Sequence, residues 1–147
     1  MKKLIFLLLA PIMFMSCDET KKVIDAAGNV QLSGTYTVNS LNGQNINTQM
    51  ELPYITFAAL DKSVKGNTGC NSFFGKYTLD LYALAFADIA STEMACEQPI
   101  MDVENAFLQA LRNTGSYQLQ NGELTLYSKT DRSVLLTAVK QKTAEDQ

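Results

Sequence analysis

The chain contains no histidine and no tryptophan among its 147 residues. Histidine is the commonest general base and zinc ligand in proteins, so its absence excludes the usual catalytic triads and most zinc sites. Without tryptophan, stacking on a ligand would fall to the six tyrosines and seven phenylalanines. No loop carries the alternating carboxylates of an EF-hand. We therefore expect neither a metal nor a cofactor.

Positive charge is also scarce, with 12 Lys and Arg against 15 Asp and Glu. From Cys17 onward the chain has ten basic and fifteen acidic residues, a net charge of −5. An acidic surface without clusters of Lys or Arg repels phosphate backbones, which argues against nucleic acid as a partner. The composition, 46% hydrophobic and 18% charged, is that of a single packed domain.

Only one long hydrophobic run occurs, from Leu4 to Met15, directly after two lysines. Its roughly twelve residues are too few to cross a bilayer core of about 30 Å as a helix, which favours a cleaved export signal over a membrane span. The ending FMSC at residues 14–17 resembles a bacterial lipobox, in which the cysteine is acylated and becomes the first mature residue. We predict a lipoprotein signal peptide over residues 1–16 and lipidation at Cys17, with a plain secretory signal as the alternative.

Lipid on Cys17 would anchor the protein stably in the membrane. Two lipid chains and an acylated amine give stable membrane binding, whereas a single acyl chain binds only marginally. Residues 17–32 mix charged and small residues and are expected to form a tether, and residues 141–147 a polar tail. The membrane is thus an expected partner through the N-terminal lipid. The expected location is the cell envelope, with the outer membrane of a Gram-negative bacterium favoured.

Alternation of apolar and polar residues predicts a sheet of antiparallel strands. The expected strands cover residues 34–41, 53–60, 73–81, 83–90, 116–120, 123–128 and 133–139. Asn121 and Gly122 predict a tight hairpin turn between two of them. Residues 61–63 are expected to turn the chain, and the segment SVKGN at residues 63–67 is expected to lead into a loop.

One helix is expected, over about residues 99–112. Pro99 suits a first helical position, and Gly115 stands beyond the end. Asp102 and Glu104 near the start complement the helix dipole. The apolar face comprises Ile100, Val103, Phe107 and Leu111. The predicted fold class is therefore α+β, mostly antiparallel β.

A short pattern recurs along the chain. The segments GTYTVN, GKYTLD and GSYQLQ begin at Gly34, Gly75 and Gly115, which are 41 and 40 residues apart. A period near 40 is compatible with a repeat array. Three copies are too few for a propeller and the helix occurs once, so reuse of a glycine before an amphipathic strand is the simpler interpretation.

Cys70 and Cys96 are the only cysteines after Cys17. We predict a disulfide between them, which would persist outside the cytosol and stabilise the fold by about 3–4 kcal/mol in the chain-entropy model. Two buried free thiols are the alternative, since a reactive cysteine would need a basic neighbour that histidine usually supplies. The glycines before Cys70 could suggest a phosphate-binding loop, but no Gly-Lys-Ser/Thr sequence follows them. We instead expect Gly66 or Gly69 to adopt the positive φ of a turn.

Four carboxylates could suggest hydrolysis. Glu93 and Glu97 flank Cys96, and Asp80 and Asp88 lie on strand-like segments. Glycoside hydrolysis by paired carboxylates requires a cleft that keeps one of them protonated. Spacing alone does not indicate such a cleft. We expect surface acids and no enzyme, with a carboxylate-dependent hydrolase as the alternative.

Five segments occur in a characteristic order: GTYTVNSLNG, GCNSFFGKYTL, IASTEMAC, NAFLQAL and NGELTLY. This composite pattern resembles the META domain (HslJ-like) family over about residues 33–140. The resemblance implies a curved sheet or cracked β-barrel packed on one helix, also similar to secretion-system pilotins that bind lipid or peptide. It implies a role in the cell envelope associated with stress response, and no reaction.

The resemblance leads to an expected function as a non-catalytic envelope protein that binds a partner protein, a peptide or a lipid. Core packing is the alternative role for each residue of the apolar wall that such a barrel would offer. The candidate wall comprises Tyr36, Phe57, Phe73, Phe74, Tyr77 and Phe86, with Ile55 and Phe107 beside them. An inhibitor or structural module that contacts proteins through the hairpin at Asn121 and Gly122 is a further alternative.

Overall fold

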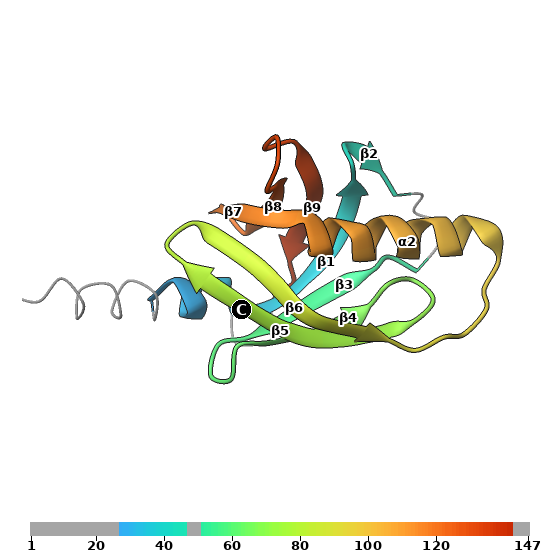
Figure 1. Cartoon of the computed structure of the whole chain (residues 1–147), viewed down its shortest axis with the longest axis horizontal. Helices are drawn as coiled ribbons and strands as arrows, with labels where there is room; N and C mark the ends of the chain where they lie inside the picture. Colours follow the sequence, from blue (N-terminus) through green and yellow to red (C-terminus); the bar gives the residue numbers. More distant parts are fainter. Residues whose placement is uncertain (1–26, 47–50, 143–147) are drawn as a thin grey trace, which may run out of the picture.

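The computed structural model describes residues 27–46 and 51–142 (Figure 1). The predicted signal peptide, the lipidation site Cys17 and residues 143–147 lie outside the described residues. The elements are β1 (Gly34–Leu41), β2 (Gln44–Asn45), β3 (Tyr54–Ala58), β4 (Ser63–Asn67), β5 (Ser72–Asp80), β6 (Ala83–Ser91), α2 (Gln98–Asn113), β7 (Thr114–Gln120), β8 (Glu123–Ser128) and β9 (Val134–Lys140). No helix in this described part of the chain is long and apolar enough to cross a membrane.

Eight strands form a closed antiparallel barrel. They follow the order β1-β3-β4-β5-β6-β7-β8-β9, and β9 pairs back with β1, while the short β2 extends β1. The Ser40 and Thr137 hydroxyls share a 2.6 Å hydrogen bond across the closing pair. The predicted fold class, mostly antiparallel β with one packed helix, is confirmed.

The barrel has a seam between β6 and β7. These strands pair at one position, Ala83 with Ser116, and the amide of Tyr117 donates to the carbonyl of Tyr82 at 3.1 Å. The other neighbouring strands of the barrel pair over four or more residues each. The helix α2 links β6 to β7 in the chain and packs against β6, β1, β9 and β8 (Figure 1). The chain therefore passes through the helix between the two strands that pair least.

The helix extends one residue further at each end than the pattern predicts, from Gln98 to Asn113. Phe107 and Leu111 are fully buried, as expected for its apolar face. Gly115 does not cap it: β7 begins directly after the helix, and Gly115 lies in that strand, where a side chain would collide with Lys129. Close packing between strands, and not helix termination, explains this glycine.

The prediction of a loop at residues 63–67 is wrong, because they form β4. Val64 and Gly66 face the core and Lys65 faces solvent, which is strand alternation with a glycine at one inward position. A side chain at Gly66 would collide with the carbonyl of Tyr54. This close approach requires a glycine at an inward position where a strand pattern would show an apolar side chain, so the strand is not recognisable from the sequence.

Aromatic and aliphatic side chains fill the barrel interior. The largest fully buried side chains are Tyr36, Tyr77, Phe57, Phe73 and Phe107, with seven Leu and Ile residues around them. The Phe57 ring meets Tyr36 and Tyr77 edge to face, with centroids 5.9 and 5.3 Å apart. Residues 27–32, assigned by composition to the tether, are helical, and Leu32 is buried in the core. The folded region thus includes part of that segment.

Because neighbouring strands are antiparallel, the connections between strands lie at two opposite ends of the barrel. We call the N-terminal end the one that carries residues 27–33 and the turns at residues 59–62, 81–82 and 121–122. The opposite end carries β2 and the loop at residues 92–97. In Figure 1 the helical residues 27–32 lie at the left, beside the turn between β5 and β6.

Candidate functional site

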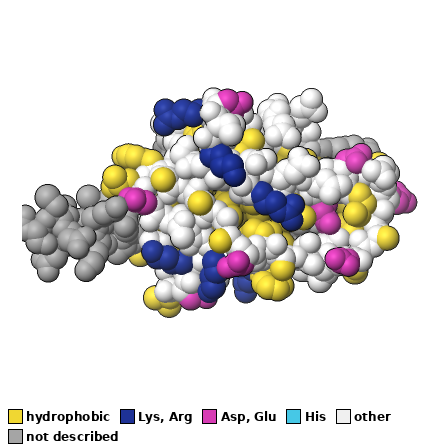
Figure 2. Space-filling view, viewed as in Figure 1, with side chains coloured by type: hydrophobic (Ala, Val, Ile, Leu, Met, Phe, Trp, Pro, Cys, Tyr) yellow, Lys and Arg dark blue, Asp and Glu magenta, His cyan; other side chains and the backbone are white. Residues whose placement is uncertain are grey.

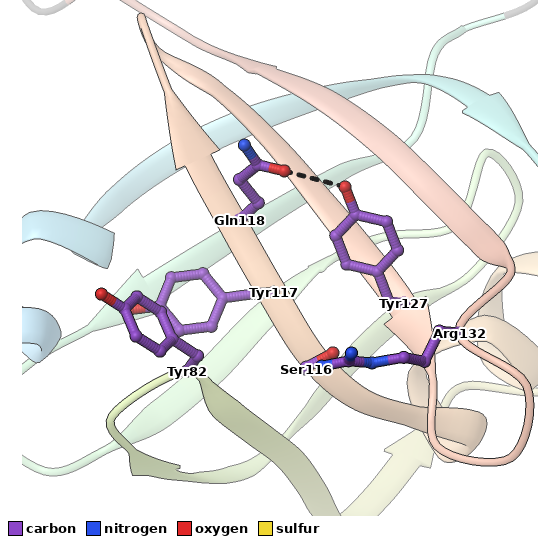
Figure 3. A pocket seen from close by; sticks show the side chains of 6 residues that line it. All are labelled: Tyr82, Ser116, Tyr117, Gln118, Tyr127 and Arg132. Carbon is purple, nitrogen blue, oxygen red and sulfur yellow. Dashed lines mark hydrogen bonds between the residues drawn. The ribbon is translucent and has the colours of Figure 1, made fainter.

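A groove of about 510 Å³ lies on the barrel surface beside the seam (Figure 3). Its lining residues are Tyr82, Ser116, Tyr117, Gln118, Tyr127 and Arg132. They come from the β5–β6 turn, from β7, from β8 and from the turn between β8 and β9. The pairing of β6 with β7 and of β7 with β8 brings these four segments together.

Strand register positions the side chains along the groove. Ser116 on β7 pairs with Tyr127 on β8, so both lie on the same face of the sheet. The Tyr127 hydroxyl donates to Oε1 of Gln118 at 2.9 Å, which holds the ring in place (Figure 3). Tyr117 packs partly against the core. Burial, followed by the neighbouring Tyr82, raises the pKa of Tyr117 above its ordinary value.

A second, more polar hollow of about 300 Å³ continues the groove across the seam. It shares Tyr82, Ser116 and Arg132 with the first and adds Gly115 and Lys129 among its lining residues. The Lys129 ammonium donates to the carbonyl of Arg112 at the end of α2, at 3.2 Å. The guanidinium of Arg132 has no ion-pair or hydrogen-bond partner among the described residues. It is therefore the cation of the groove that can accept an anionic group from outside.

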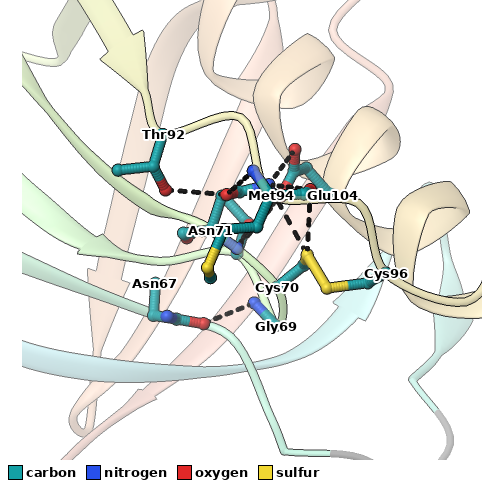
Figure 4. The surroundings of a disulfide bond; sticks show 9 residues. Asn67, Gly69, Cys70, Asn71, Thr92, Met94, Cys96 and Glu104 are labelled. Atoms are coloured by element: carbon teal, nitrogen blue, oxygen red, sulfur yellow. Dashed lines mark hydrogen bonds between the residues drawn. A yellow bond between two sulfur atoms is a disulfide. The ribbon is translucent and has the colours of Figure 1, made fainter.

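The opposite side of the molecule carries a disulfide. Cys70, in the loop after β4, is bonded to Cys96, just before α2, with Cα atoms 6.2 Å apart (Figure 4). Gly69 beside it has φ +101° and donates its amide to Oδ1 of Asn67 at 2.7 Å. The glycine thus serves a tight turn, and its amide bonds within the loop.

Asn71 connects the disulfide loop to the segment before the helix. Its Oδ1 accepts from the Thr92 hydroxyl at 2.7 Å and from the Met94 amide at 2.8 Å. Its Nδ2 donates to the Met94 carbonyl at 3.1 Å and to the Glu104 carboxylate at 3.0 Å. The buried side-chain amide is therefore fully hydrogen-bonded, as an interior polar group must be.

Glu104 is the buried acceptor of this network. It is 6% exposed and accepts from the Thr68 hydroxyl, from the Asn71 amide at 3.2 Å and from the Asn71 side chain. The sequence suggested only that Glu104 complements the helix dipole. Its spacing was the available signal, since Glu104 lies four residues after Ile100 and three before Phe107 on the inward face of α2. We call Cys70, Asn71, Cys96 and Glu104 the disulfide corner.

Comparison with known families decides what the chain is related to. The META domain family model matches residues 29–141. The chain belongs to the META domain family. The match begins four residues before Ser33, where the sequence pattern had placed the start of the domain, and so includes the buried Leu32.

Solved structures share the fold of this META domain. A protein from Burkholderia xenovorans, solved by NMR, is 22% identical with a TM-score of 0.63, over 97% of this chain and 99% of its own. A second NMR structure is 24% identical with a TM-score of 0.60, over 76% and 93%. A DUF4847 family protein from Bacteroides vulgatus is 18% identical with a TM-score of 0.55, over 79% and 99%. No curated protein matches the chain.

The six residues of the predicted apolar wall do not share one surface of the META domain. Tyr36, Phe57, Phe73 and Tyr77 are buried in the core, and Phe86 is partly buried against it. Phe74 alternates with Phe73 on β5, so it faces outward and is 64% exposed. The buried members pack against one another, and a ligand inside the barrel would have to displace them.

The four carboxylates singled out in the sequence are all exposed. Asp80 and Asp88 lie on β5 and β6, and Glu93 and Glu97 lie in the loop before α2. No group of three or more potential metal ligands occurs within residues 27–46 and 51–142. The groove residues were not singled out, because no local pattern marks Tyr82, Tyr127 or Arg132.

Proposed function

We propose that this META domain is a non-catalytic binding module of the cell envelope. A lipid on Cys17 holds it at the membrane, and the groove beside the seam binds an extended peptide segment of an envelope protein. The observation that carries the proposal is the groove itself: tyrosine side chains around an Arg132 guanidinium that has no partner among the described residues. The lipobox-like FMSC sequence at residues 14–17 supports the anchor.

The composition of the groove favours a protein partner over a lipid. Tyrosine and arginine dominate the residues that contribute most to protein–protein binding, because each combines a large apolar area with a hydrogen-bonding end. Acyl chains require an enclosed apolar cavity, whereas here Gln118, Ser116 and Arg132 line an open surface. The filled barrel interior supports the same choice.

An extended peptide also suits the adjacent strand. On its β6 side, β7 is paired only at Ser116 among the described residues. An extended segment lying along this edge would add main-chain hydrogen bonds to the side-chain contacts of the groove. Arg132 would then select an Asp or Glu side chain of the peptide, since a guanidinium binds a carboxylate through two parallel hydrogen bonds.

A positional library of fluorescein-labelled hexapeptides, measured by anisotropy against the full protein extracted in detergent, tests the groove. We expect binders to carry Asp or Glu at one fixed position and to lose about tenfold or more in affinity with Arg132→Gln, the loss of one charge-assisted contact. The matched control is Arg112→Gln, which changes the same charge at the end of α2. Equal affinity for wild type and Arg132→Gln, or no preference for an acidic residue, would contradict the proposal.

The anchor is tested separately by mass spectrometry of the protein isolated from its own envelope. We expect the chain to begin at Cys17 and to carry the mass of the attached acyl groups. The variant Cys17→Ala should lose both and leave the membrane fraction. An unacylated chain that is cleaved elsewhere would contradict the anchor and leave the groove untouched.

A further inference from the structure

We propose that the N-terminal end of the barrel docks on the surface of the membrane that holds the lipid anchor. This inference rests on the proposed anchor at Cys17 and is independent of the groove. Three apolar side chains from separate segments are exposed at this end: Val30 is 69% exposed, Leu60 fully exposed and Leu81 48% exposed. Single exposed apolar residues are common on protein surfaces, and Met94, 58% exposed, is one at the opposite end, so the proposal rests on three separate segments presenting apolar side chains at the same end.

The topology explains why these residues face the same way. Val30 belongs to the helical segment at residues 27–32, Leu60 to the β3–β4 turn and Leu81 to the β5–β6 turn, all at the N-terminal end. The helical segment lies against this end, since a side chain at Gly28 would meet Leu79. In Figure 2 hydrophobic side chains are visible at the left end of the described part of the molecule.

The turn at residues 81–82 departs from the chemistry of its counterparts. The two-residue turns at residues 42–43 and 121–122 both use Asn-Gly, which suits positive φ. The β5–β6 turn instead has Leu81 at φ 55° followed by Tyr82, which is 77% exposed. Leucine in a left-handed conformation is strained. An interfacial contact of the exposed Leu81 side chain accounts for a leucine at this position of the turn.

The position of the anchor identifies the membrane as the occupant. Cys17 precedes Ala27 by ten residues, and ten residues span at most about 35 Å when fully extended. Because the described chain begins at the N-terminal end, this end is the part of the barrel held closest to the bilayer. A short connection keeps the local concentration of lipid surface high, so even a weak contact is occupied.

Charge favours the same orientation. Glu93 and Glu97 are exposed in the loop at the opposite end, where an anionic bilayer would repel them. The N-terminal end carries both signs: Asp61 is paired with Lys76 at 3.5 Å and Lys62 is exposed, while Asp80 and Glu123 are exposed beside the turns at residues 81–82 and 121–122. Docking by the N-terminal end therefore keeps Glu93 and Glu97 away from the lipid headgroups.

The test uses the full acylated protein in vesicles of phosphatidylethanolamine and phosphatidylglycerol. An environment-sensitive fluorophore is attached at Leu60→Cys, and at Gln44→Cys on the opposite end as the matched control, with the disulfide left unreduced. We expect a blue shift and quenching by lipid-borne spin labels at position 60 and neither at position 44. Replacing Leu81 by Asn in the Leu60→Cys protein should weaken the quenching without lowering the thermal midpoint, because asparagine suits the turn.

Flotation of the vesicles separates the possible failures. A protein that does not float with the vesicles would overturn the anchor and the docking together. A protein that floats but is quenched equally at positions 44 and 60 would overturn the docking alone, with the anchor standing. Cross-linking between two Leu60→Cys chains in the vesicles would assign this end to a second copy and would likewise overturn the proposal.

Discussion

The disulfide corner and the groove lie on one barrel but are built in opposite ways. In the corner, Asn71 and Glu104 are buried and hydrogen-bonded to each other beside a covalent link. In the groove, Tyr82 is exposed and Arg132 has no partner among the described residues. The buried hydrogen bonds that stabilise this domain are thus concentrated near the start of the helix. The surface beside the β6–β7 seam has few such bonds and is open to a ligand.

The largest expected effect is on the corner. Replacing Cys70 and Cys96 by serine should lower the free energy of unfolding by about 3.5 kcal/mol, because the link spans 26 residues and restricts the unfolded chain. Urea denaturation of the oxidised wild type and the double variant measures the loss. Peptide binding by the folded variant should be unchanged, and a loss of binding would break the separation between the two regions.

Glu104→Ala should cost about 3 kcal/mol, since it leaves the donors of Thr68 and Asn71 buried without their acceptor. Asp102→Ala on the exposed side of the same helix is the matched control and should change stability by less than about 0.5 kcal/mol. Urea denaturation curves of both variants measure the two changes in the free energy of unfolding. Equal losses would mean that removal of a carboxylate near the helix N-terminus, and not the buried network, explains the effect.

The barrel interior should respond to alkaline pH. Burial, followed by the charge of Tyr117, raises the pKa of Tyr36 from 10.0 to about 12. The folded state keeps this proton while the unfolded chain loses it, so the stabilisation is complete below pH 10 and is lost as pH rises toward 12. Urea midpoints across this range should fall for wild type and fall less steeply for Tyr36→Phe. Parallel curves would exclude Tyr36 as the cause.

The smallest expected effect on stability is in the groove. Tyr82→Ala removes a mostly exposed side chain and should change the free energy of unfolding by less than about 0.5 kcal/mol. The same variant should weaken peptide binding, as measured by anisotropy. A large loss of stability would show that the groove and the corner do not divide stability and binding as proposed.

Local chemistry made part of this fold predictable. The helix needs only a proline at its start and apolar residues at helical spacing, and it was predicted within one residue at each end. The hairpin between β7 and β8 follows from Asn121 and Gly122, both of which have positive φ. These features depend on neighbours in the sequence, so the sequence displays them directly.

Features that depend on distant neighbours were missed. The strand β4 was missed because one of its inward positions is Gly66, which has no apolar side chain to complete the pattern. A side chain there would collide with the carbonyl of Tyr54 on the adjacent strand. Glu104 has the appearance of a surface acid until Asn71 is placed against it. The groove joins turns separated by about fifty residues, and the pairing of β6 with β7 brings Tyr82 near Arg132. Closure of the barrel was implied by the family resemblance and by no local pattern.

Pairing of β1 with β9 has a consequence for biogenesis. The edge of β1 that pairs with β9 has no partner until β9 has been synthesised. Ser40 on β1, for example, bonds Thr137 on β9, which lies 97 residues later in the chain. Cys96 precedes Thr137 by 41 residues. Both partners of the disulfide are therefore present in a growing chain before the pair of strands that closes the barrel is complete.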